Sequence, residues 1–218
     1  MPKTVAVSII KTERLTKELV LRHLSADALV ILAKDYSEIS VKDELSGKSE
    51  KLLTLGKLTK LASGAVFIGF TADRYDRKLK SVAVFLNGRL VKIADETRGG
   101  KSGFAPSYGY KSVKVGALKM GVAVGKDVCD NACLSALTAT ENDVIINLSA
   151  DFYDFSTENL ISSLSYLYGT AIVSVNSDKS CIAANGKSIL STSACEKDCS
   201  FLINNVYKEV HIKQRGLY

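Results

Sequence analysis

The chain has 218 residues, of which 46% are hydrophobic and 24% charged, enough to bury one sizeable core, and we expect a single domain over residues 1–218. No apolar run approaches the roughly 18 residues of a membrane span, so we expect no membrane partner. The net charge of +6 comes from 29 basic and 23 acidic residues, with scattered lysines and no tryptophan. This pattern argues against nucleic-acid binding, although an RNA-associated basic protein stays an alternative.

The N-terminal sequence MPKTVAVSII leads directly into a strand-like run. It lacks the charged start, apolar stretch and cleavage site of a signal peptide, so we expect a cytoplasmic protein. An odd cysteine count without such a signal indicates reduced thiols. The spacing is CxxxC in two places rather than the CxxC of structural zinc, and there are only two histidines, so we expect no metal and no cofactor. The cysteines are Cys129, Cys133, Cys181, Cys195 and Cys199.

Apolar and β-branched runs predict strands along the whole chain. The predicted strands are Thr4–Ile10, Ala28–Leu32, Ala65–Phe70, Ser81–Leu86, Arg89–Ile93, Ser112–Val115, Leu118–Val124, Val144–Leu148, Ala171–Val175, Ser180–Ala184, Ser188–Ser191 and Phe201–Val206. Helical periodicity predicts helices over Glu13–Leu24, Ser49–Leu61, Asn131–Thr138 and Thr157–Tyr168. Asn87-Gly88 and Asn185-Gly186 predict two hairpins, because Asn-Gly favours the positive φ angles of a type I′ turn.

Several central strands are apolar throughout, such as ALVIL, VIINL and AIVSV. Strands of this kind are covered on both faces, as in a sheet that lies between two other layers. With the order of the predicted elements, this favours an α/β protein in which two mixed sheets pack face to face with helices outside. We therefore predict a four-layer αββα sandwich.

The segment Lys119–Ala150 reads as strand, sharp elbow, helix and strand, with the elbow at Gly125-Lys126-Asp127. It resembles the nucleophile region of the carbon-nitrogen hydrolase (nitrilase) superfamily, where the pattern is Gly-Val-x-Ile-Cys-Tyr-Asp. Gly121, Val122 and Asp127 match that pattern. The segments ADALVILAKDYSEIS, KLKSVAVFLNGRLVKIADETRGG and YGTAIVSVN resemble further family segments in the same order, so the resemblance covers most of the chain. It implies the same αββα architecture.

The resembled family uses a Cys nucleophile, a Glu general base and a Lys that stabilises the oxyanion. Carried over by position, the base falls on Lys34, the lysine on Glu96 and the nucleophile on Gly125. The resemblance therefore implies a pocket in which all three catalytic positions are vacant. A shift of one residue would bring Asp35 and Asp95 to the sites instead, and it would still not restore the triad.

The signs at two of these positions are exchanged, since an acid became Lys34 and a lysine became Glu96. One hypothesis is a reversed ion pair between them, within about 4 Å. The alternative is that both are ordinary solvated charges at strand ends.

Two functions follow. The first is a protein of this fold that has lost hydrolase activity and acts as a binding or assembly subunit, with a small molecule as a candidate ligand. The second is an amidase or nitrilase-type hydrolase that uses Cys129 as a relocated nucleophile. The resemblance also implies a homodimer through the helices at 131–138 and 157–168, because the family pairs its subunits through the equivalent helices.

Overall fold

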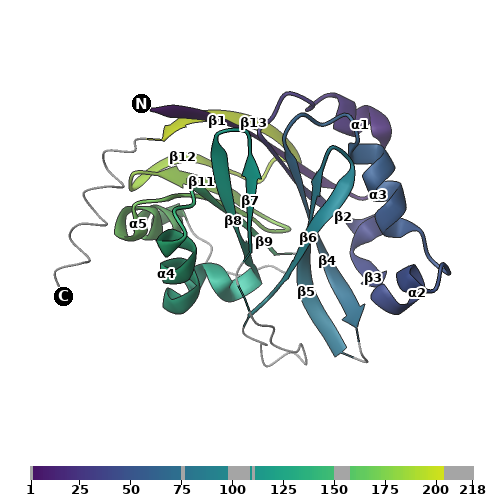
Figure 1. Cartoon of the computed structure of the whole chain (residues 1–218). Helices are drawn as coiled ribbons and strands as arrows, with labels where there is room; N and C mark the ends of the chain where they lie inside the picture. Colours follow the sequence, from purple (N-terminus) through teal and green to yellow (C-terminus); the bar gives the residue numbers. More distant parts are fainter. Residues whose placement is uncertain (1, 75–76, 98–108, 110, 150–157, 204–218) are drawn as a thin grey trace.

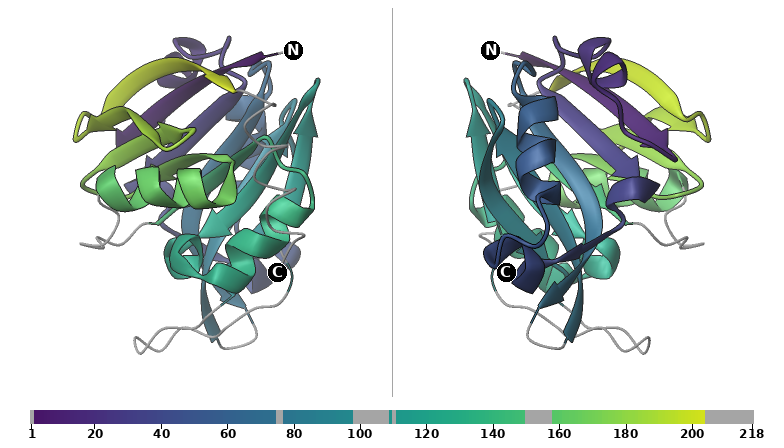
Figure 2. Two further views of the ribbon diagram at one scale, coloured as in Figure 1. Left: turned by 90° about the vertical axis from the view of Figure 1, so that its left-hand side faces the viewer. Right: turned by 90° about the vertical axis from the view of Figure 1, so that its right-hand side faces the viewer.

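Two β-sheets lie face to face with helices on their outer sides (Figure 1). The computed structural model describes residues 2–74, 77–97, 109, 111–149 and 158–203. Figure 2 shows the same layers from two sides, with α1, α2 and α3 over one sheet and α4 and α5 over the other. No helix within these ranges is long and apolar enough to cross a membrane.

The first sheet has seven strands in the order β13-β1-β2-β4-β5-β6, with β3 paired to β4. Strand β2 runs parallel to β1 and β4, whereas β13, β5 and β6 join by antiparallel pairing. The strands are β1 (Lys3–Thr12), β2 (Ala28–Ala33), β3 (Glu38–Ser40), β4 (Ala65–Arg74), β5 (Arg77–Leu86), β6 (Arg89–Asp95) and β13 (Glu196–Ile203).

The second sheet has six strands in the order β12-β11-β10-β9-β8-β7. Its central strands β8, β9 and β10 are parallel, so their carboxyl ends meet at one edge of the sheet. The strands are β7 (Lys111–Val115), β8 (Leu118–Val124), β9 (Val144–Leu148), β10 (Ala171–Val175), β11 (Ser180–Ala184) and β12 (Lys187–Thr192).

The helices follow the strands as crossover segments and are capped by side chains. The hydroxyl of Thr16 accepts from the Leu19 amide at the start of α1, and the Asp130 carboxylate accepts from the Ala132 amide at the start of α4. The helices are α1 (Lys17–Leu21), α2 (Val41–Leu45), α3 (Lys51–Thr59), α4 (Asn131–Ala139) and α5 (Glu158–Tyr168), with 3₁₀ turns η1 (Lys34–Tyr36) and η2 (Gly125–Cys129).

Three buried clusters separate the four layers. The largest lies between the two sheets and includes Phe67, Met120 and Val173. A second lies between the first sheet and its helices, and a third lies under α4 and α5. The predicted αββα sandwich is confirmed, and the strands that are apolar throughout are those that contribute to two clusters at once.

The predicted strands and both hairpins are confirmed, and Asn87, Gly88, Asn185 and Gly186 all have positive φ. Three expectations differ from the structure. The first helix spans only Lys17–Leu21, and β3 and α2 were not predicted. The last strand begins at Glu196 rather than at 201, because its polar residues pair with β1 at the edge of the sheet, and residues 204–206 lie outside the described ranges.

Candidate functional site

The candidate site is the elbow at the carboxyl end of β8. Val124 is extended, Gly125 has a φ of +58°, and the 3₁₀ turn η2 leads through Asp130 into α4. A positive φ of this kind costs an L-residue roughly 1–2 kcal/mol, so glycine suits this position. The elbow is the strand-to-helix turn expected from the sequence.

The carboxylate of Glu96 occupies the space beside Gly125. A Cβ atom built on Gly125 would lie 2.4 Å from Glu96 Oε1 and 3.1 Å from its Cδ. The Glu96 side chain is buried, at 1% exposure, and its Oε1 accepts a hydrogen bond of 2.9 Å from the amide of Lys126. Two of the three positions predicted to form a pocket, Glu96 and Gly125, are therefore brought into contact.

Lys80 is a third member of this site that was not predicted. Its Cδ lies 3.7 Å from the same Cβ position at Gly125, the residue is buried, and its carbonyl accepts from the Glu96 amide. On β5 it stands on the same face as Val82 and Val84, which belong to the core between the sheets. The sequence signal for its position is the alternation along β5, which places Lys80 on the same inward-facing side as Val82 and Val84.

Asp127 fixes the segment that carries Glu96 onto the elbow. Its two carboxylate oxygens accept from the amide of Thr97 at 3.1 and 3.0 Å, and Oδ1 also accepts from the Thr97 hydroxyl at 2.7 Å. Burial raises the pKa of Asp127 to about 6, against the Thr97 hydrogen bonds that favour its ionised form, and the nearby Glu96 adds to the rise. These hydrogen bonds between Asp127 and Thr97, the Thr97–Asp127 clamp, fix the residue that follows Glu96 and so hold Glu96 in place.

Chemically, the site offers a carboxylate and a lysine amine around a glycine. These groups can bind a polar ligand or hold a proton. The three atoms nearest to the Cβ position at Gly125 belong to Glu96 and Lys80, and none of them is a thiol or hydroxyl that could form a covalent intermediate.

The reversed ion pair between Lys34 and Glu96 is wrong. Lys34 begins the 3₁₀ turn after β2, its side chain is 74% exposed, and its Nζ lies 2.6 Å from Glu13 Oε1. Glu96 is buried at the elbow, and no ion pair joins it to Lys34 within the described ranges. The turn after β2 buries Tyr36 in the outer core. The alternative, that both residues are solvated charges, therefore holds for Lys34 but not for the buried Glu96.

The neighbouring acids Asp35 and Asp95 have partners of their own away from Gly125. Asp35 is exposed and accepts from the Leu15 amide at 3.0 Å, where it fixes the loop before α1. Asp95 accepts from the Ser81 hydroxyl at 2.5 Å. As the residue before Glu96 in an extended segment, Asp95 points to the opposite face of the sheet. At the elbow, Lys126 is exposed and contributes its backbone amide to Glu96.

Cys129 ends the 3₁₀ turn η2. Partial burial raises the pKa of its thiol, which keeps it in the less nucleophilic protonated form. The Cys129 side chain is nevertheless exposed to solvent in part. All five cysteines are free thiols.

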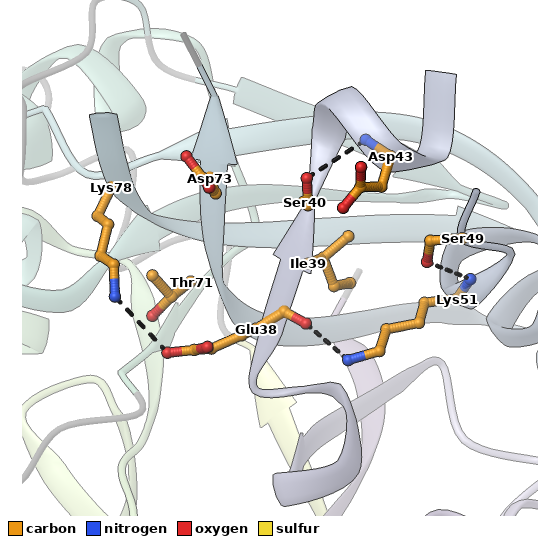
Figure 3. A pocket seen from close by; sticks show the side chains of 9 residues that line it. All are labelled: Glu38, Ile39, Ser40, Asp43, Ser49, Lys51, Thr71, Asp73 and Lys78. Carbon is orange, nitrogen blue, oxygen red and sulfur yellow. Dashed lines mark hydrogen bonds and ion pairs between the residues drawn. The ribbon is translucent and has the colours of Figure 1, made fainter. Parts of the chain in front are cut away.

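A separate hollow of about 340 Å³ lies beside β3, the carboxyl end of β4 and the amino end of β5 (Figure 3). Its acid Glu38 lies 3.8 Å from Lys78 Nζ, and the Glu38 carbonyl accepts from Lys51. Figure 3 shows these two lysines reaching Glu38 from opposite sides. Lys78 thus pairs with the Glu38 carboxylate and Lys51 with its backbone carbonyl. None of the three triad positions lines the hollow among the described residues.

The sequence matches no family model and no curated protein. Solved structures share its fold. Nit3 of Saccharomyces cerevisiae, a member of branch 10 of the nitrilase superfamily, has a TM-score of 0.76 at 12% identity, over 97% of this chain and 94% of that chain. A CN-hydrolase superfamily protein from Xanthomonas campestris, with an arsenic adduct in its active site, has a TM-score of 0.72 at 10% identity, over 97% and 95%.

A variant of the Nesterenkonia AN1 amidase from the nitrilase superfamily has a TM-score of 0.68 at 11% identity, over 97% of this chain and 96% of that chain. In another structure, that amidase carries the acetamide moiety of fluoroacetamide on its active-site cysteine. Because these identities are low, the comparisons show the fold alone. The resemblance to the nitrilase superfamily is confirmed at that level.

Proposed function

We propose that this chain is a nitrilase-fold protein that has lost hydrolase activity and acts as a binding or assembly subunit. The observation that carries the proposal is the Glu96 carboxylate beside Gly125, in the space that a nucleophilic side chain would need. A thiol at this position would meet Glu96 and would require a strained backbone. The Thr97–Asp127 clamp holds Glu96 in this space, which supports the proposal that Gly125 has no nucleophilic counterpart.

The Nesterenkonia amidase carries a covalent adduct on its active-site cysteine, whereas the cysteines near this elbow are Cys129 and Cys133. Burial raises the pKa of the Cys133 thiol, and the nearby Asp127 and Asp130 add to the rise. The raised pKa of Cys129 works against its use as a thiolate. This favours the binding function over the relocated nucleophile.

We expect no turnover when the purified protein is incubated with a panel of short-chain amides and nitriles. Without a covalent intermediate, most of the rate of such an enzyme is lost. Product ammonia is measured for the wild type and for Cys129→Ala, and both should match the rate without protein. Ammonia release that disappears in Cys129→Ala would establish the amidase alternative.

We also expect a homodimer through α4 and α5. On α5, the side chains of Tyr166 and Leu167 are 53% and 57% exposed. Two large apolar side chains next to each other on the outer face of a helix are typical of a surface that another protein covers. Leu164 packs against the core under this helix, so a change at Leu164 would test the core rather than the surface. The informative variant is Leu167→Glu, which places a charge on the exposed face.

Light scattering at tens of micromolar measures the mass of wild type and variant. Leu167→Glu should convert the dimer to a monomer. The matched control is Leu202→Glu, since Leu202 is 60% exposed on β13 of the other sheet and should leave the dimer intact. A monomeric wild type, or a dimer that tolerates Leu167→Glu, would contradict the prediction.

A further inference from the structure

A buried lysine lies at one end of the interface between the sheets. Lys11 is 9% exposed and continues on β1 the inward-facing series that contains Val7 and Ile9. Its Nζ donates to the carbonyl oxygens of Asp178 at 3.0 Å and Ser193 at 3.3 Å, in turns that follow β10 and β12. These contacts join the first sheet to the turns of the second sheet.

Lys11 has no carboxylate within 4.0 Å of its Nζ in the part of the chain that the structure describes. Buried charges in proteins are normally paired, and an ammonium carries three donors, of which the two carbonyls use two. Burial also lowers the pKa of Lys11, against weaker attraction from Cys195 and Asp178. Among the described residues, none of the three donors of this buried cation therefore has a charged acceptor, and the two carbonyls leave one donor for a ligand.

Lys11 lines a cavity of about 480 Å³, within the range of small-molecule sites. Leu32, Ala33 and Gly69 form an apolar wall of this cavity. Gly125 and Glu96 are not among its described lining residues, so this cavity is distinct from the elbow site.

The other charges at the cavity are compensated or solvated. Lys34 and Glu13 form their own exposed pair at the rim. Asp178 is exposed, so water screens its carboxylate. Lys11 is thus the cation at this cavity that a ligand would have to neutralise.

We propose that this cavity binds a small monocarboxylate, whose carboxylate accepts a hydrogen bond from Lys11 Nζ while its short alkyl chain lies against Leu32, Ala33 and Gly69. The buried cation selects the charge of the ligand, and the apolar wall selects a carbon chain over a compact inorganic anion. This inference goes beyond the loss of hydrolase activity and holds whether or not the elbow is active.

The test is calorimetric titration of the full chain with straight-chain acids from acetate to hexanoate. Affinity should rise by about fourfold for each buried methylene. Butyramide, which has the same shape without the charge, and inorganic phosphate should each bind at least tenfold more weakly than butyrate. Equal affinity for butyrate and butyramide would overturn the proposal, and so would tighter binding of phosphate.

Lys11→Met should weaken butyrate binding at least tenfold. Lys34→Met is the matched control, because Lys34 lines the same cavity but is exposed and already paired with Glu13, and it should change affinity less than threefold. If Lys11→Met does not fold, the Lys11 pKa is followed by NMR in the wild type, where saturating butyrate should raise it and butyramide should not. Unchanged binding in folded Lys11→Met, or an unchanged pKa with butyrate, would contradict the assignment.

Discussion

Introducing a cysteine at the elbow, Gly125→Cys, should destabilise the protein by about 2–5 kcal/mol and should not create an amidase. The positive φ at Gly125 contributes roughly 1–2 kcal/mol of strain for any L-residue. Overlap of the new Cβ with Glu96 Oε1, at 2.4 Å, adds about 1–3 kcal/mol of overpacking. Chemical denaturation of both proteins measures the difference in the free energy of unfolding.

The matched control is Gly116→Cys. Gly116 has a φ of +56°, and a Cβ at this position has no atom within 4 Å. The loss of stability in Gly116→Cys should therefore report the backbone strain alone. The additional loss in Gly125→Cys should report the overlap with Glu96.

A double-mutant cycle of Gly125→Cys with Glu96→Ala isolates the contact. We expect a coupling of about 1–3 kcal/mol, because the second change removes the group that the cysteine meets. Equal costs at Gly125 and Gly116, together with a coupling near zero, would mean that Glu96 does not fill the nucleophile's space. That result would remove the main support for a lost hydrolase activity.

The clamp residue Asp127 should make the protein less stable as the pH rises from about 4 to 7. Its pKa is raised from 3.8 to about 6 in the folded state, so in this window the folded protein holds a proton that the unfolded chain has released. The free energy of unfolding then falls with rising pH. Since one pKa unit corresponds to about 1.36 kcal/mol, the effect is about 3 kcal/mol.

The measurement is urea denaturation at several pH values for the wild type and for Asp127→Asn. Glu18, Glu158 and Asp198 have lowered pKa values and change stability in the opposite direction, so the informative quantity is the difference between the two proteins. Thr97→Val provides a second control. It removes a hydroxyl that favours the ionised carboxylate, so the loss of stability should extend to higher pH. Identical pH profiles for wild type and Asp127→Asn would contradict the prediction.

The strands, the hairpins and the layer order could be predicted because their signals are local. Asn-Gly at 87–88 and 185–186 selects positive φ angles from within the turn itself. A strand such as Val144–Leu148, apolar at every position, needs cover on both faces wherever it lies. The elbow at Gly125 was found in the same way, as a break between a strand and a helix.

The composition of the site could not be predicted, because it depends on how the layers meet. Lys34 and Glu96 each follow a strand end, yet the turn after β2 leaves one in solvent and the clamp at Asp127 buries the other. Lys80 and Lys11 are at positions where the inward-facing side of a strand continues past the apolar core. Whether such a lysine is buried or solvated depends on the facing sheet, whose turns are distant in sequence. The sequence by itself thus determined the fold and the position of the elbow at Gly125, while only the tertiary structure decided which charges are buried and which side chain fills the space beside Gly125.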